Sequence, residues 1–355
     1  MKKTIVFTGG GSAGHVTANL ALIPEFIRMG WSIIYIGSKN GIESGLIEKF
    51  KEVNYLAIST GKLRRYFSVK NFTDPFRVIN GIFQAYKFIR KYKPDVVFSR
   101  GGFVSVPVVL AAWLNRVPIV MHESNITPGL ANRITAPFAT KICLTFSETM
   151  KYIRSKKTVE VGPIIRNELK TGNLENARSL CGFSPVKPVI LIMGGSLGSK
   201  RINEIVRRNI GVILDNYQVV HICGKGGADQ TCQLPGYKQF EYIYEELADL
   251  FAMADFVISR AGANSICEFL SLHKPMLLIP LPLKVSRGDQ VLNAESFQRN
   301  GYAEILWEKD LTDSNFLNSI SRIASRKSEM CANMQRRNGV NSLSNMVGLI
   351  KSSAK

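Results

Sequence analysis

The segment Thr4–His15 reads TIVFTGGGSAGH: an apolar run, then a loop with four glycines and a terminal histidine. Apolar residues then recur at helical spacing, at Leu20, Ile23, Phe26 and Ile27. The segment therefore predicts a strand, a glycine loop and the start of a helix. The backbone N–H groups of such a loop can approach an anionic or polar ligand, and a helix N-terminus favours negative charge.

Short β-branched runs alternate with helical patterns along the rest of the chain, which predicts βαβ units and parallel sheets. We expect strands over residues 5–8, 33–37, 55–58, 95–99, 119–122, 142–145, 189–193, 219–223, 256–259 and 276–279. A break at Val161-Gly162-Pro163 precedes a second strand, glycine loop and helix. The sequence thus predicts an α/β protein with two Rossmann-like domains, residues 1–162 and 163–341, facing a cleft. A terminal helix over about 342–355 is expected to pack on the first domain.

The composition limits the classes of protein to which the chain can belong. The chain has 355 residues, 45% hydrophobic and 21% charged, which suits a globular protein of two domains. No apolar run approaches the roughly 20 residues of a membrane-spanning helix, and we expect no signal peptide. Six scattered cysteines without a C-x-x-C pair argue against structural zinc and for a reducing cytoplasm.

The net charge of +19 is concentrated in the first half of the chain. Residues 1–162 hold 23 Lys and Arg against nine Asp and Glu, whereas residues 163–355 hold 23 against 18. A basic domain indicates an anionic partner, such as nucleic acid, a phosphate-bearing substrate or an anionic lipid surface. Solubility and biased composition are the alternative explanation.

The first glycine loop matches G-x-G-x-x-G at Gly9, Gly11 and Gly14, a weak dinucleotide signal on its own. A dinucleotide site needs an acidic residue at the end of the second strand to bind a ribose. That strand ends Tyr35-Ile36-Gly37-Ser38-Lys39, without one, so NAD is disfavoured. Tight packing alone does not require His15, which instead suits a functional loop.

The second domain offers two phosphate-binding candidates. Gly194–Ser199 is a glycine loop without a Walker A ending, and Ser196 would offer its hydroxyl and N–H to a phosphate. In Arg260–Glu268, the N–H groups of Ala263–Ser265 at a helix start could hold a diphosphate without metal. Glu268 could accept both hydroxyls of a ribose. The alternatives are a simple turn for the loop and a favourable helix charge for Glu268.

An amphipathic segment in the first domain suggests a membrane surface. Asp74-Pro75 predicts a helix start, and apolar residues then occupy two adjacent faces, although the core needs only one. Nine Lys and Arg residues lie between residues 62 and 93. Apolar anchors among cations are typical of peripheral binding to anionic lipid. The expected patch comprises Phe72, Phe76, Ile79, Ile82, Phe83 and Trp113; an ordinary buried helix is the alternative.

Together these segments resemble the MurG family of bacterial peptidoglycan glycosyltransferases. The resemblance covers nearly the whole chain and rests on Gly9–His15, Gly101–Ser105, His122–Asn125, Gly162–Arg166, Gly194–Ser199, Arg260–Glu268 and Asp289-Gln290. It implies the GT-B fold and transfer of N-acetylglucosamine from UDP-GlcNAc to lipid I, the undecaprenyl-diphosphate-linked MurNAc-pentapeptide, giving lipid II. It also implies docking on anionic lipid at the cytoplasmic face of the membrane. One departure is Gly-Ser-Ala-Gly-His, where the family commonly has Gly-Thr-Gly-Gly-His.

The resemblance also implies roles for individual residues. His15 matches a proposed general base, and an imidazole, with an ordinary pKa near ~6.5, suits that role. Glu123 is the rival base or the partner that orients His15. No metal or cofactor is expected, which agrees with the lack of a D-x-D cluster. The implied UDP-GlcNAc contacts are Ser12, Ala13, Gly14, Asn125 (or an acceptor contact), Arg166, Ser196, Ile243, Ala263, Asn264, Ser265, Ile266, Cys267, Glu268 and Gln290.

Two other functions stay open from sequence. Another GT-B enzyme that uses a UDP-sugar, either a glycolipid synthase or a UDP-GlcNAc epimerase, would share the donor site. A non-catalytic nucleic-acid-binding or membrane-binding protein would explain the charge of +19. That second alternative does not require His15 or Glu268, and the chain has no recognisable nucleic-acid module. We therefore expect no nucleic-acid partner.

Overall fold

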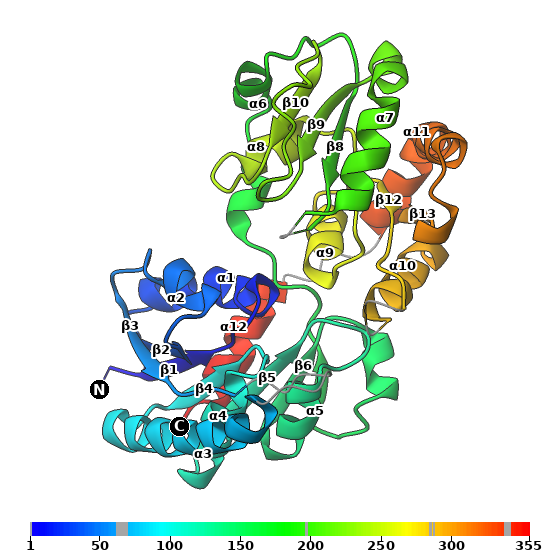
Figure 1. The fold of residues 1–355 in the computed structure, drawn as a ribbon. Helices are drawn as coiled ribbons and strands as arrows, with labels where there is room; N and C mark the ends of the chain where they lie inside the picture. Colours follow the sequence, from blue (N-terminus) through cyan, green and yellow to red (C-terminus); the bar gives the residue numbers. More distant parts are fainter. Residues whose placement is uncertain (1, 62–69, 196–197, 284–285, 287, 337–341) are drawn as a thin grey trace. The chain divides into compact units, whose positions relative to one another are not determined.

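A computed structural model of the chain describes residues 2–61, 70–195, 198–283, 286, 288–336 and 342–355 (Figure 1). The chain divides into two compact units. The first comprises residues 1–166 and 340–355, and the second comprises residues 167–339. No helix in the described ranges is both long enough and apolar enough to cross a membrane.

The first unit is built on a parallel sheet that, within the described residues, has seven strands in the order β3-β2-β1-β4-β5-β6-β7. The strands are β1 (Thr4–Thr8), β2 (Ser32–Ser38), β3 (Val53–Ile58), β4 (Val96–Ser99), β5 (Ile119–Glu123), β6 (Lys141–Leu144) and β7 (Thr158–Glu160). The helices are η1 (Ala13–His15), α1 (Thr17–Arg28), α2 (Ile42–Ile47), α3 (Lys70–Tyr92), α4 (Ser105–Leu114), α5 (Leu130–Thr135), η2 (Ala136–Phe138), η3 (Ser147–Lys151) and α12 (Ser342–Ser353).

The second unit repeats this plan with a described parallel sheet of six strands, in the order β10-β9-β8-β11-β12-β13. The strands are β8 (Val189–Met193), β9 (Gln218–Ile222), β10 (Tyr237–Phe240), β11 (Phe256–Ser259), β12 (Met276–Leu278) and β13 (Ala303–Ile305). The helices are η4 (Asn167–Lys170), α6 (Leu174–Cys181), α7 (Lys200–Asn216), α8 (Leu247–Met253), α9 (Ala263–Ser271), α10 (Asp289–Arg299), η5 (Glu308–Asp310) and α11 (Asp313–Arg336). Both strand orders are of the Rossmann type, which confirms the fold class expected from sequence.

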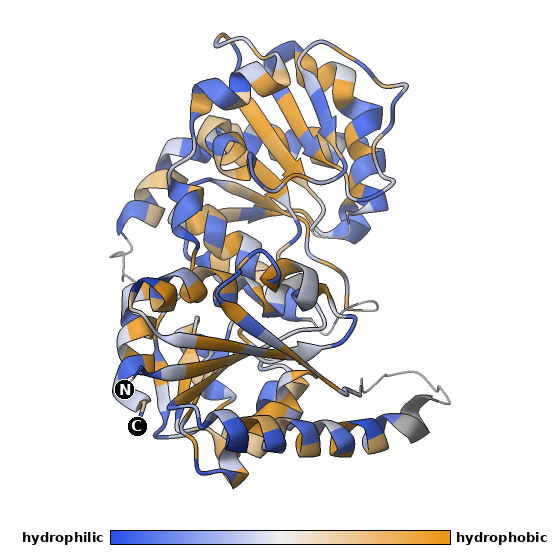
Figure 2. Cartoon of the chain, turned by 90° about the vertical axis from the view of Figure 1, so that its left-hand side faces the viewer, coloured by the Kyte–Doolittle hydropathy of each residue, from blue (hydrophilic) through white to orange (hydrophobic). Residues whose placement is uncertain are grey.

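The strands are mostly apolar because helices cover both faces of a parallel sheet. Hydrophobic colour accordingly concentrates on the strands in Figure 2. On one face of the first sheet, Phe7 of β1 makes edge-to-face contacts with Phe26 and Phe98, at ring-centroid distances of 5.8 Å. These contacts place α1 directly over the centre of the sheet.

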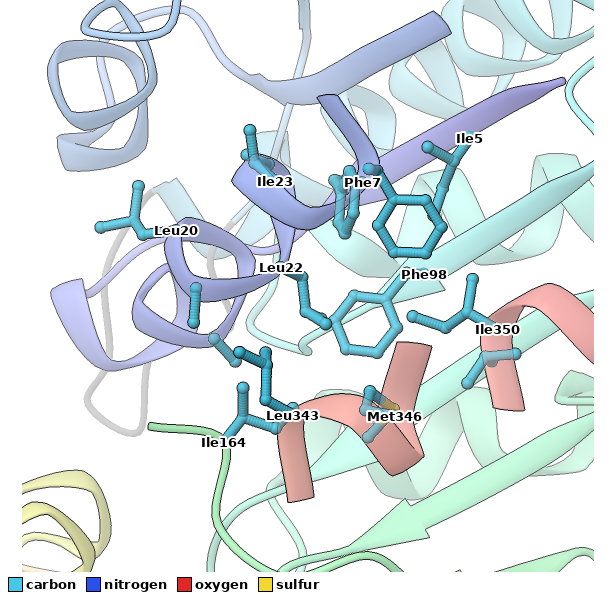
Figure 3. Close-up of a cluster of buried hydrophobic side chains, with 14 of the residues drawn as sticks. Ile5, Phe7, Leu20, Leu22, Ile23, Phe98, Ile164, Leu343, Met346 and Ile350 are labelled. Carbon is cyan, nitrogen blue, oxygen red and sulfur yellow. The ribbon is translucent and has the colours of Figure 1, made fainter. Parts of the chain in front are cut away.

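The last helix, α12, completes the core of the first unit. Leu343, Met346 and Ile350 are buried in the same cluster as Phe7 and Phe98 (Figure 3). Their spacing of three and four residues places them on one face of the helix. The C-terminal segment therefore belongs to the first unit, although about 170 residues of the second unit separate it from that unit in sequence.

Two sequence predictions about elements need correction. Helix α3 begins at Lys70, so the expected start at Asp74-Pro75 is wrong; Pro75 lies inside the helix. Proline there removes one intrahelical hydrogen bond, and the buried side chains of Ala85 and Ile89 anchor the helix beyond it. The edge strands β7, β10 and β13 were not expected, because their short sequences, Thr-Val-Glu, Tyr-Lys-Gln-Phe and Ala-Glu-Ile, contain no continuous apolar run.

Candidate functional site

The strand order of each unit creates a topological switch point. In the first sheet, β1 lies between β2 and β4, so the connections that leave β1 and β4 run in opposite directions. The second sheet has the same arrangement at β8 and β11. Ligands of open α/β sheets bind beside the carboxyl ends of the strands at such points. The loops that follow β1, β4, β8 and β11 are the segments that the sequence singled out.

The loop after β1 is fixed by buried side chains of the first unit. The Tyr35 hydroxyl donates to the carbonyl of Gly9 at 2.5 Å, and the Asn19 amide donates to the Tyr35 hydroxyl at 3.1 Å. Burial raises the pKa of Tyr35, so this phenol remains a donor. The start of the glycine loop is therefore held by side chains from α1 and β2.

Glu43 of α2 holds the same loop from the other side. Its fully buried carboxylate accepts hydrogen bonds from the N–H of Ser38 at 3.0 Å and the hydroxyl of Ser38 at 2.5 Å. It also accepts from the N–H of Gly11 at 3.2 Å. An acid does therefore follow the second strand, but it binds the protein's own backbone. Sequence reasoning missed it, because Glu43 lies five residues beyond the end of that strand.

His15 ends the short helix η1 and is half-buried. Its Nδ1 lies 3.3 Å from the carbonyl oxygen of Arg100, the residue that follows β4. A carbonyl oxygen can only accept a hydrogen bond, so Nδ1 carries the proton in this arrangement. The basic lone pair of the neutral ring then resides on Nε2, which is the form that a general base requires.

Two glycines bring the loop after β4 against its neighbours. Gly102 has φ +79, and a Cβ there would meet the Gly10 carbonyl oxygen at 2.2 Å and the His15 ring at 3.1 Å. Gly101 has φ +84, and its Cβ would meet the Asn132 amide oxygen at 2.5 Å. Only glycine tolerates both the backbone conformation and the approach. The Gly101-Gly102 pair thus connects His15 with the segment after β5.

Glu123, the last residue of β5, is buried and organises that segment. Its carboxylate accepts from the N–H and side-chain amide of Asn125, at 2.9 and 3.3 Å. It also accepts from the N–H of Gly129 at 2.9 Å and the amide of Asn132 at 2.8 Å. Four donors occupy this carboxylate, which favours a positioning role for Glu123 over that of a base.

His122 is a core residue. It is buried, and its Nε2 lies 3.0 Å from the Thr145 hydroxyl. Burial, reinforced by the Arg100 guanidinium, holds the pKa of His122 well below its usual value. His122 is therefore neutral at physiological pH and supports β5 beneath Glu123.

In the second unit, Arg260 joins three segments around the second glycine loop. Its guanidinium donates to the Ser199 hydroxyl at 2.8 Å and to the carbonyl of Ile279 at 3.1 Å. It also forms an ion pair of 2.5 Å with Glu308. Ser199 is the N-cap of α7, so Arg260 fixes the helix start that follows the loop. Ser196, the phosphate-binding candidate, lies outside the described residues.

Helix α9 begins directly after β11 and Arg260. Gly262 is its N-cap, and Ala263, Asn264 and Ser265 form the first turn, whose N–H groups lie at the positive end of the helix. The side chains of Ile266 and Cys267 are buried in the core. A ligand at this helix start would therefore meet these two residues through their backbone. Glu268 follows in the second turn and is buried.

The remaining predicted residues lie on four separate segments. Gln290, in the first turn of α10, accepts a hydrogen bond from the N–H of Leu281 at 3.0 Å through its amide oxygen. Its amide N–H₂ can still donate. Ile243 is half-buried between β10 and α8, and Arg166 is buried at the end of residues 1–166, the longer segment of the first unit. Ser12 is exposed and Gly14 is half-buried, both in the loop after β1.

Two family models match the chain, one over each of its two sheets. Residues 5–144 match the glycosyltransferase family 28 N-terminal domain, and residues 189–347 match the family 28 C-terminal domain. The chain belongs to glycosyltransferase family 28. The matched segments include all the switch-point loops described above, in both units.

Curated relatives match this family 28 chain over its whole length. A protein of Geobacillus kaustophilus is 55% identical over 356 residues and covers 100% of both chains. One from Clostridium botulinum is 53% identical and covers 100% of this chain and 99% of its own. Both are named UDP-N-acetylglucosamine--N-acetylmuramyl-(pentapeptide) pyrophosphoryl-undecaprenol N-acetylglucosamine transferase.

Solved structures share the fold at low sequence identity. The crystal structure of MurG from Acinetobacter baumannii superposes with a TM-score of 0.76, at 23% identity, over 99% of this family 28 chain and 100% of that one. The calicheamicin glycosyltransferase CalG4 gives a TM-score of 0.71 at 14% identity, over 99% and 98%. The two-unit architecture is therefore that of the GT-B glycosyltransferases.

Proposed function

We propose that this chain transfers N-acetylglucosamine from UDP-GlcNAc to the C4 hydroxyl of MurNAc in lipid I, forming lipid II with inversion at the anomeric carbon. The observation that carries the proposal is identity of 50–55% over nearly the whole chain to relatives named for this transferase activity. The switch-point loops supply the chemistry that such a transfer needs. The chain thus acts as a hexosyltransferase of peptidoglycan synthesis.

His15 is proposed as the general base. Transfer requires the acceptor hydroxyl to lose its proton as it attacks the anomeric carbon. The Arg100 carbonyl holds the proton of His15 on Nδ1, so Nε2 can receive the hydroxyl proton. Glu123 then acts as a positioning residue, because its hydrogen bonds fix the segment from Asn125 to Asn132 that would contact the acceptor.

The second unit is proposed to bind the donor. The N–H groups of Ala263, Asn264 and Ser265 at the start of α9 stabilise the diphosphate, whose charge increases as the sugar leaves. Glu268 binds the ribose, Ile243 the uracil through its backbone, and Gln290 the sugar through its amide N–H₂. Ser12, Ala13, Gly14, Asn125, Arg166 and Ser196 complete the proposed contacts.

Helix α3 is proposed as the membrane-docking element. Phe76, Ile79 and Phe83 are 74%, 51% and 63% exposed on it, and Trp113 of the adjoining α4 is 52% exposed. These four residues are the exposed apolar patch. Ile82 is half-buried, and the side chain of Phe72 lies outside the described residues. Figure 2 shows hydrophobic and hydrophilic residues side by side along α3. Arg77, Lys87 and Arg90 are exposed on the helix and would attract anionic lipid of the inner leaflet.

The deciding experiment uses the purified full chain, radiolabelled UDP-GlcNAc and a lipid I analogue. We expect the label to appear in a disaccharide-bearing lipid. Lipid I without its MurNAc C4 hydroxyl serves as the control acceptor and should remain unlabelled. Transfer to diacylglycerol, or epimerisation of UDP-GlcNAc without transfer to lipid I, would instead support one of the other enzyme functions. No transfer by folded protein would exclude the proposed function.

A further inference from the structure

A cavity of about 470 Å³ lies in the second unit, at the amino ends of its central strands. Its walls include Lys187 and Val189 at the start of β8, Asp255 before β11, and Lys274 before β12. The proposed donor loops follow the opposite ends of the same strands. Strand β8 alone separates the two edges by roughly 13 Å, at ~3.3 Å per residue. The cavity is therefore distinct from the proposed donor site.

Positive charge dominates the lining of this cavity. Arg178, Lys187, Lys274 and Lys327 line the cavity together with one carboxylate, that of Asp255. Asp255 already accepts a hydrogen bond from the N–H of Val189 at 2.8 Å and forms an ion pair with Lys327. Arg178 forms an ion pair with Glu175 at 2.9 Å, and Lys187 donates to the carbonyl of Leu214 at 2.7 Å. Two carboxylates therefore balance the four cations only in part, and an excess of positive charge remains.

Lys274 is the most constrained of these cations. Its ammonium donates to the carbonyls of Ala254 and Ala252, at 2.7 and 3.5 Å. An ammonium has three donors, so one N–H remains for another acceptor. Burial lowers the pKa of Lys274; Asp255 opposes this effect, and the Lys327 ammonium adds to it. A further negative charge beside these two ammonium groups would relieve their repulsion.

Most of the remaining lining is apolar, with Leu174, Pro188 and Met253 among its side chains, and His273 and Cys331 complete it. A volume near 470 Å³ lies within the range of small-molecule sites, roughly 300–1,000 Å³. This volume is larger than a simple inorganic ion requires. An apolar wall beside a cluster of cations matches a molecule with an apolar body and an anionic head.

We propose that this cavity binds a small organic phosphate, with the phosphate at Lys274 and Lys327 and an apolar body against Met253. A phosphate monoester carries nearly two negative charges and suits a group of ammonium donors. The site lies away from the transfer chemistry, so its ligand regulates or stabilises the second unit without competing for UDP-GlcNAc.

The test uses phenyl phosphate as the probe and full-length protein with ¹³C-labelled methionine methyl groups. The Met253 resonance is assigned with Met253→Leu. Phenyl phosphate should shift this resonance in a saturable way, both without and with saturating UDP. Benzyl alcohol, a neutral molecule of similar shape, should not. Equal binding of the two compounds, or no shift of Met253, would overturn the proposal.

Variants localise the phosphate. Lys327→Met should raise the Kd of phenyl phosphate at least tenfold, whereas Lys327→Arg should keep it within about threefold. Lys170→Met, which removes an exposed lysine of the same unit, is the matched control. If the resonances of the other methionines are the same as in the wild type, the variant is folded. An unchanged Kd in Lys327→Met would refute the site, whatever the outcome of the transfer assay.

Discussion

Two carboxylates hold the loops of the first unit, and each acts on backbone. Glu43 accepts from Gly11 in the loop after β1, and Glu123 accepts from Asn125 and Gly129 after β5. Loops with a fixed backbone present the same atoms to every substrate, which reduces the cost of reaching the reactive geometry. His15 ends the first of these loops and lies against the loop after β4, the strand between β1 and β5 in the sheet.

His15→Ala should lower kcat for transfer to lipid I by about 10²–10⁴-fold, the usual contribution of a general base. The KM for UDP-GlcNAc should change little, since the donor is proposed to bind the second unit. Steady-state kinetics with the lipid I analogue measure both values. His273→Ala, which alters an exposed histidine of the second unit, is the control. A kcat near that of the wild type would exclude His15 as the base.

Glu43→Gln should weaken catalysis through the loop. An amide N–H₂ at this position faces the N–H of Gly11, so one acceptor is replaced by a donor. Loss of a hydrogen bond to a charged group costs about 1.5–3 kcal/mol, and we expect at least a tenfold lower kcat/KM for the lipid acceptor. Binding of UDP-GlcNAc, measured by calorimetry, should be unchanged. Glu48→Gln alters an exposed acid just past the same helix and should have no effect. Equal kcat/KM values for the two variants would contradict this role of Glu43.

Among the elements, α3 departs most from an ordinary surface helix. One side is anchored in the core by Ala85 and Ile89, while Phe76, Ile79 and Phe83 face solvent. The sequence predicted two apolar faces, and the structure buries only one of them. Large exposed apolar side chains on one helix, with cations beside them, indicate a surface that is covered in its working environment.

Phe76→Asp combined with Ile79→Asp should weaken binding to vesicles that contain phosphatidylglycerol at least tenfold. Full burial of one large apolar side chain contributes about 1.5–3 kcal/mol. Vesicle sedimentation measures this binding. Activity on a soluble acceptor analogue should be retained. Val212→Asp places one carboxylate on an exposed apolar position of α7 and is the control. Equal vesicle binding by the wild type and the double variant would refute membrane docking through α3.

The sequence predicts elements better than it predicts the contacts between them. Most central strands could be located because parallel strands covered on both faces are continuous apolar runs. The edge strand β10, which reads Tyr-Lys-Gln-Phe, has too little pattern to be distinguished from a loop. Glu43, Asn132 and Arg260 form hydrogen bonds with groups that lie between nine and 61 residues away in the sequence. Periodicity contains no signal for such partners.

At the level of the whole molecule, buried neutral histidines connect stability to pH. His221 of β9 lies 2.8 Å from the Tyr237 hydroxyl and 3.0 Å from the Asn203 amide oxygen. Burial, with a contribution from Arg207, lowers the pKa of His221 to about 3. An unfolded histidine titrates near ~6.5. Between these two pKa values the unfolded chain binds more protons than the folded chain does. The contribution of the neutral His221 to the free energy of unfolding is therefore fully present above pH 6.5 and declines as the pH falls toward 3.

His221→Gln should therefore reduce the loss of stability on acidification. Between pH 7 and pH 5, the wild type should lose roughly 2 kcal/mol more than the variant, since a glutamine does not titrate. Urea unfolding of both proteins at each pH provides the measurement. His122 also makes stability fall on acidification, but it does so equally in the wild type and in His221→Gln, so its effect cancels in the comparison. Identical pH dependence would contradict a neutral, buried His221.

Met346→Ala tests how strongly the last helix supports the first unit. Met346 is fully buried in the cluster of Figure 3. Truncation of a buried methionine to alanine costs about 2–5 kcal/mol, and the first unit should unfold at lower urea concentration. The exposed Asn345→Ala is the control and should be neutral or slightly stabilising. A midpoint equal to the wild type would show that α12 adds little to this core.

The position of α12 has a consequence for synthesis. The ribosome makes the sheet of the first unit first, then the entire second unit, and finally the helix that supplies Leu343, Met346 and Ile350 to the first core. During translation, part of the apolar surface of the first unit therefore remains exposed until α12 has been made. The second unit is continuous in sequence and can fold completely before then. The unit that is synthesised second therefore reaches its native fold first. Nascent chains stalled before residue 340 should consequently bind chaperones through their N-terminal half.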